Sequence, residues 1–165
     1  MAFPNDRTYS FDINLSLSDN AAAYTTNGFS QVSGADGVVD LGGNQGTSPV
    51  QQARIDAVCV VDVTALDATT TDESYRLILA VSNDPTFANG KAVVAVETEI
   101  AGGVLSVLGL GGAGVTGTGT TGRYELMFTN QIAGVIYQYA KLFNVVSGTT
   151  PIINYDAFIA VLPEP

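Results

Sequence analysis

The chain has 165 residues, of which 46% are hydrophobic and 13% charged, and its 16 acidic against six basic residues give a formal net charge of −10. This balance predicts one folded domain and excludes a disordered chain, while the acidic excess excludes nucleic acid as a partner, because phosphates would be repelled. The sequence contains no histidine, the side chain that supplies most general bases at neutral pH, so we expect no enzymatic activity.

Alternating apolar residues place the first predicted strand at 9–17, where every second residue from Tyr9 to Leu17 is apolar. A turn-rich stretch with Asn-Gly and Asp-Gly pairs follows, interrupted by a short apolar run at 38–41. From 54 to 63 both faces are apolar, which predicts a strand covered on both sides. Cys59 lies in this run and is expected to be a small buried hydrophobic residue.

The second half of the chain predicts a hairpin and three further strands. Strands at 75–81 and 92–98 flank a turn rich in Asn, Asp and Pro. The remaining predicted strands lie at 124–129, 136–146 and 155–161. This makes at most eight strands, and only a weak helical pattern at 67–73 competes with them. Short strands with glycine-rich turns predict an all-β, single-domain, jelly-roll-like antiparallel β-sandwich with long Gly/Thr-rich loops.

The predicted domain spans 1–165 and has three irregular parts. These are an N-terminal arm at 1–8, a flexible Gly/Thr-rich loop at 101–122 and a C-terminal tail at 162–165, whose prolines cannot continue a sheet. The arm has no apolar core beside positive charge, so no secretory signal is expected. The loop is uncharged, but it is too polar and too rich in glycine to span a bilayer, so no membrane partner is expected.

Two motifs suggest a cofactor or a metal ion, and neither has the required context. Residues 109–114 match the GxGxxG spacing of dinucleotide-binding turns, but glycines and threonines follow where that chemistry needs a helix. We therefore predict no cofactor. The carboxylates do not follow the EF-hand spacing, and no metal-ligating residues are predicted. A calcium ion held by loop carboxylates from separate strands would leave no spacing signature, and that alternative stays open.

Several segments carry a resemblance to a known family. They are Val38-Val39-Asp40-Leu41-Gly42, the strand at 75–81 with its turn at 82–87, Gly122-Arg123-Tyr124-Glu125-Leu126, and the closing strand through Ala160. With these segments the chain resembles the cement, or decoration, proteins of tailed-bacteriophage capsids, which have a jelly-roll fold. The resemblance implies a structural virion protein, made in the host cytoplasm and located on the outer capsid surface. It would bind the major capsid protein and form dimers or trimers.

Candidate contacts to the capsid or to other subunits lie in the arm, the loop, the tail and the strand at 136–146. They are Phe3, Pro4, Gly102, Gly109, Gly112, Gly117, Tyr137, Tyr139 and Pro163. Glycine-rich loops can become ordered against a partner, and the two tyrosines are expected to share one face of their strand. The alternative function is a carbohydrate-binding β-sandwich module on the virion surface, which the absence of tryptophan disfavours. A hydrolase with paired carboxylates ranks last.

Overall fold

The computed structural model describes residues 9, 11–42, 54–67, 72–88, 90–101, 104–105, 115–116 and 121–161. Over these ranges the regular secondary structure is almost entirely β-strand, and the one helical element among them is the short 3-10 turn η1 (Ile13–Leu15). None of the described residues belongs to a helix that could cross a membrane. The all-β class predicted from the sequence is confirmed.

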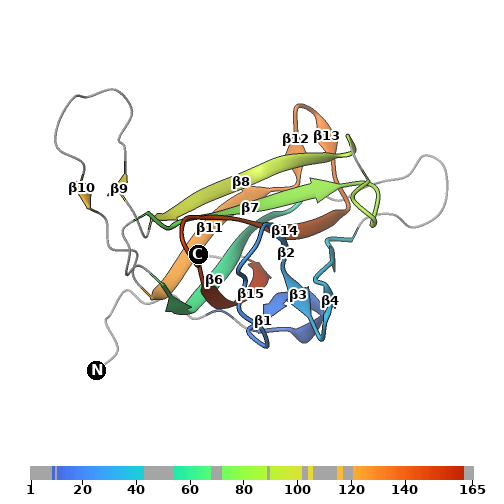
Figure 1. The fold of residues 1–165 in the computed structure, drawn as a ribbon. Coiled ribbons are helices and arrows are strands. Elements are labelled where there is room, and N and C mark those ends of the chain that lie inside the picture. Colours follow the sequence, from blue (N-terminus) through green and yellow to red (C-terminus); the bar gives the residue numbers. More distant parts are fainter. Residues whose placement is uncertain are drawn as a thin grey trace, which may run out of the picture.

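Two antiparallel sheets face each other as a sandwich (Figure 1). The four-stranded sheet has the order β1 (Ser16–Asp19), β15 (Ile153–Val161), β6 (Asp56–Leu66), β11 (Gly122–Thr129). The five-stranded sheet has the order β2 (Gly28–Phe29), β14 (Tyr139–Ser147), β7 (Ser74–Ser82), β8 (Ala92–Ala101). Its fifth strand, β5 (Val39–Asp40), pairs with the same edge of β14 as β2 does. The predicted hairpin is therefore confirmed as β7 and β8.

The core fills the space between the sheets, and β6 shows how the sequence specifies it. Its inward side chains are Ala57, Cys59, Val61 and Val63, all buried. Its outward side chains Val58 and Val60 are buried as well, in a second apolar cluster with Phe158 and Ala160. The strand is therefore covered on both faces, as predicted.

Cys59 lies completely buried in this core, as predicted. Burial raises the pKa of its thiol to about 12, because the thiolate would lose its hydration. Since the thiolate is the reactive form, we expect no alkylation of the folded protein by iodoacetamide at pH 8 and rapid alkylation in denaturant. Mass spectrometry of timed samples measures both rates. Rapid labelling without denaturant would contradict the burial of this thiol.

The strand predicted at 9–17 is wrong for most of its length. Residues 13–15 form η1, and β1 begins only after it. Asp12 is the cause, because its side chain accepts a hydrogen bond of 2.9 Å from the backbone N–H of Asn14. This local bond takes up a donor that a strand would offer to a neighbour. As a result, Phe11 and Ile13 are exposed instead of facing the core.

Two short hairpins change the predicted strand pattern. The strand predicted at 136–146 divides into β13 (Val135–Ile136) and β14, because β13 pairs with β12 (Gln131–Ile132). The turn-rich stretch contains β2 and a similar hairpin of β3 (Gln31–Val32) and β4 (Ala35–Asp36). Both turns place two residues at positive φ, Ala133-Gly134 and Ser33-Gly34, as type I′ turns require. The described ranges thus hold fifteen strands rather than eight, and the additional ones are two residues long.

The predicted arm at 1–8 and tail at 162–165 lie outside the described residues, as does most of the loop at 101–122. Within that loop, β9 (Val104–Leu105) and β10 (Val115–Thr116) are described, and they pair with each other in antiparallel fashion. The flexibility of the loop stays a prediction.

Candidate interaction surface

Two of the predicted contact residues, Tyr137 and Tyr139, are described by the structure. Tyr137 lies between β13 and β14, where its backbone N–H donates to the carbonyl of Asn130 at 2.9 Å and its side chain packs against the core. Tyr139 begins β14 and is half-buried. Between them, the backbone N–H of Gln138 donates to Asn83 Oδ1 at 3.0 Å instead of to a strand. The prediction that both tyrosines share one strand face is therefore wrong.

The other predicted contact residues lie outside the described ranges. They are Phe3, Pro4, Gly102, Gly109, Gly112, Gly117 and Pro163. Their role in binding stays a prediction. The outward faces of the two sheets are described, and they hold a surface that the sequence analysis missed.

The register of the four-stranded sheet arranges its outward side chains in rows. One row contains Met127, Val58 and Ala160, and the next contains Glu125, Val60, Phe158 and Ser16. We call Met127, Val58, Ala160, Val60 and Phe158 the apolar band. An antiparallel sheet commonly exposes a polar outer face to water, so an apolar outer face requires a cover.

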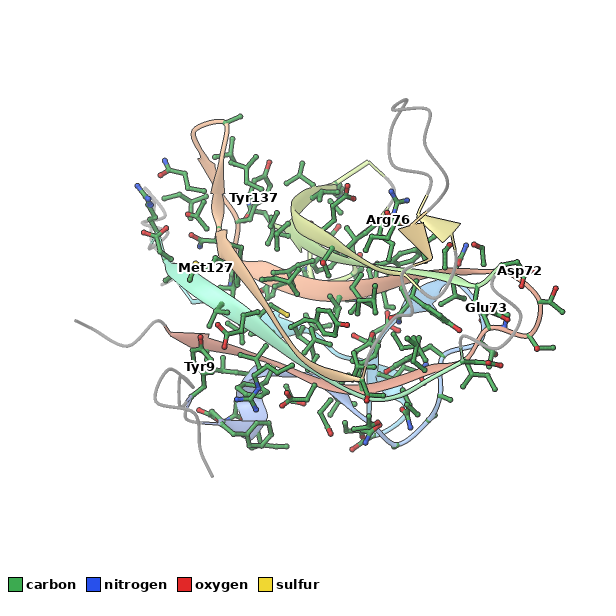
Figure 2. The ribbon with its side chains drawn as sticks, turned by 90° about the vertical axis from the view of Figure 1, so that its left-hand side faces the viewer. Tyr9, Asp72, Glu73, Arg76, Met127 and Tyr137 are labelled. Atoms are coloured by element: carbon green, nitrogen blue, oxygen red, sulfur yellow. The ribbon has the colours of Figure 1, made fainter. Side chains whose placement is uncertain are left out.

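Residues preceding β1 supply part of that cover. Tyr9 packs against the buried members of the apolar band, and its hydroxyl donates to Glu125 Oε2 at 2.9 Å. The ring of Phe11 meets the ring of Phe158 edge to face, with centroids 5.3 Å apart. Figure 2 shows Tyr9 and Met127 at the same end of the molecule. Because Phe11 and Met127 stay more than half exposed, the cover is incomplete.

A charged row crosses the same face beside the apolar band. We call it the acidic row, and it consists of Arg123, Asp62, Asp156 and Asp19, each opposite the next on neighbouring strands. Arg123 donates two hydrogen bonds of 2.8 Å to the carboxylate of Asp62. Asp19 instead accepts backbone N–H groups, from Ser33 at 2.7 Å and from Ala21 at 3.1 Å, which lowers its pKa. With three carboxylates and one guanidinium, the row carries excess negative charge.

Asp156 lies in the middle of the acidic row. Its pKa is raised mainly by partial burial, and further by the negative charges of Asp62 and Asp19. At a pH above this raised pKa, the ionised carboxylate of Asp156 therefore destabilises the folded state. The destabilisation is lost as the pH falls through the pKa. We expect Asp156→Asn to raise the melting temperature at pH 7. The gain is less than about 1 kcal/mol, because solvent screens the site, and it should fade toward pH 3. Thermal unfolding at both pH values measures this, and an equal gain at both would exclude a charge effect.

On the outer face of the five-stranded sheet, aromatic side chains pack on one another and on Lys141, while Val94 on β8 stays exposed. Lys141 Nζ lies 4.7 Å and 5.1 Å from the ring centroids of Phe29 and Phe87, and it donates to Asp36 at 2.9 Å. Lys141 and Phe87 are buried, and Phe29 also packs edge to face on Phe143. The ammonium group is thus held by two rings and one carboxylate, as in other cation–π contacts.

A buried hydrogen bond joins the two sheets through the core. The hydroxyl of Tyr155 on β15 donates to Asn144 Oδ1 on β14, and both residues are completely buried. Asn144 Nδ2 donates in turn to the carbonyl of Gly28 at 3.2 Å. Burial raises the pKa of Tyr155 well above its usual value, so the hydroxyl stays neutral. This bond is a direct polar link between the two sheets.

The sequence contained only part of the signal for the apolar band and the acidic row. Apolar residues on both faces of 54–63 indicated a covered strand, and Asp62 marks where that pattern changes. The rows themselves depend on strand register, which brings Arg123 and Asp156 to either side of Asp62. Register between distant strands has no local sequence signature.

Comparisons with known proteins add no assignment. No protein-family model matches the chain, and no curated protein and no solved structure matches it. Among the described residues, no group of three or more His, Cys, Asp or Glu side chains is placed to hold a metal ion. The chemistry of the outer faces therefore carries the functional proposal.

Proposed function

We propose that this protein is a structural virion protein that binds the outer surface of a mature phage capsid and cements neighbouring major capsid subunits. The observation that carries the proposal is that large apolar side chains reach solvent beside the four-stranded sheet. Met127 on β11 is 53% exposed, and Phe11 and Ile13, which precede β1, are 59% and 65% exposed. Exposed apolar surface of this kind is typical of protein contacts.

The strand order supports jelly-roll connectivity as part of this proposal. The first strand β1 pairs with the last strand β15, and β2 and β5 pair with β14. Further inward along the chain, β6 pairs with β11, and β7 pairs with β8. Nested pairing of this kind arises when one long antiparallel hairpin folds over on itself, as jelly rolls do.

The test is co-sedimentation of the purified full chain with expanded heads and with unexpanded procapsids of the phage that encodes it. We expect saturable binding to expanded heads at a fixed ratio to the major capsid protein, because weak contacts repeated over a lattice add up through avidity. Absence of binding to either shell would overturn the proposal. A glycan array would then test the carbohydrate-binding alternative.

A further inference from the structure

The two outer faces differ in what surrounds their exposed apolar side chains. On the five-stranded sheet, Phe87 and Lys141 are buried against each other and against Phe29. On the four-stranded sheet, Phe11 and Met127 are more than half exposed at the margin of the apolar band. The turn η1, which leads into the edge strand β1, adds the exposed side chain of Ile13. The five-stranded sheet also exposes Val94 on β8, so the four-stranded face is distinguished by exposed apolar side chains that lie on the same face as the acidic row.

The acidic row gives this surface a definite charge. Its one cation, Arg123, is held by both oxygens of the Asp62 carboxylate. Asp156 and Asp19 form no ion pair with any cation in the described ranges. An incoming cation would relieve the repulsion among these carboxylates, whereas an incoming anion would increase it. The surface is thus complementary to an apolar strip with a basic border.

We propose that the exposed side chains at the margin of the apolar band, Phe11 and Met127, form the capsid-facing surface of this protein together with the acidic row, and that the shell offers them an apolar strip flanked by Lys or Arg side chains. This inference rests on the proposed function. The apolar strip would cover Phe11 and Met127, and the basic side chains would lie against Asp19 and Asp156. Because the acidic row crosses all four strands, charge pairing would also orient the domain on the shell.

Two glutamate substitutions test which sheet faces the shell. Met127→Glu and Val94→Glu add the same charge at side chains that are equally exposed, 53% each, on opposite sheets. We expect Met127→Glu to weaken binding to expanded heads by about tenfold and Val94→Glu to change it by less than about twofold. Equal losses, or a loss confined to Val94→Glu, would overturn the inference.

Two charge reversals test the acidic row. Asp156→Lys places a cation between Asp19 and Asp62, so the folded state should melt at or above the wild-type temperature while binding weakens by about tenfold. A loss of binding without a loss of stability cannot arise from unfolding. Glu99→Lys, on the exposed side of β8, makes the same change in net charge and should leave binding within about twofold. Unchanged binding of Asp156→Lys, or equal losses in both variants, would overturn the inference.

Binding of the wild-type chain to expanded heads is measured beside the four variants. If the wild-type chain does not bind, the proposed function fails, and the inference fails with it. If the wild-type chain binds and all four variants bind equally well, only the assignment of the four-stranded face fails. Binding by the wild-type chain should also weaken as salt is raised, because ions screen the charge pairing.

Discussion

Replacing Gly148 by alanine is expected to destabilise the fold by at least about 3 kcal/mol. Gly148 follows β14 with a φ of +112°, a conformation that residues with a Cβ rarely adopt. A Cβ at this position would lie 2.6 Å from the Cα of Glu73 and 2.7 Å from the carbonyl oxygen of Asp72. Both neighbours are backbone atoms, so no change of side-chain rotamer relieves the clash. Urea unfolding monitored by circular dichroism measures the loss.

Gly134→Ala is the matched control for this substitution. Gly134 also has a positive φ, +83°, but no atom lies within 4 Å of the position that a Cβ would take. We expect the free energy of unfolding to fall by about 1 kcal/mol, because only the positive φ is unfavourable for alanine at this position. The difference between the two variants therefore isolates the close approach of Gly148 to the residues before β7. Equal losses of unfolding free energy in the two variants would show that the backbone of Asp72 and Glu73 does not lie close enough to Gly148 to exclude a Cβ.

Tyr155→Phe is expected to cost about 2 kcal/mol, although it removes a single oxygen atom. The hydroxyl of Tyr155 is the donor to Asn144 Oδ1, and both residues are inaccessible to water. Without it, the amide oxygen loses this partner in the core, and the full cost of removing that oxygen from water is no longer offset. Thermal and urea unfolding measure the change.

Tyr9→Phe is the control for Tyr155→Phe. It also removes a hydroxyl that donates to a side-chain oxygen, in this case Glu125 Oε2 at 2.9 Å. That bond is exposed, so water replaces the lost donor, and we expect a change of less than about 0.5 kcal/mol. A cost for Tyr155→Phe as small as that for Tyr9→Phe would show that the bond between the sheets contributes little to stability.

The contact residues predicted from the sequence differ from the surface that we propose from the described residues. The sequence analysis selected glycines of the loop and residues near both ends, because such segments pack poorly against their own domain. Of those residues, only Tyr137 and Tyr139 are described, and Tyr137 packs inward against the core. The local pattern of apolar residues in a strand cannot show which of its two faces is covered by the rest of the chain. The cover depends on residues that are far away in the sequence.

The all-β class and most long strands could be predicted from the amino-acid sequence alone, because alternation with a period of two reflects burial locally in each strand. The prediction failed at 9–17, where the Asp12 carboxylate accepts a local hydrogen bond from the backbone of Asn14 and so competes with the strand that the alternation predicts. The acidic row and the cover of the apolar band form only when the strands pair and the chain folds. Tyr9 and Glu125 meet across 116 residues, and Asp19 lies opposite Asp156. Contacts of this kind depend on how the strands pair and how the two sheets stack, and those choices are made by the whole chain.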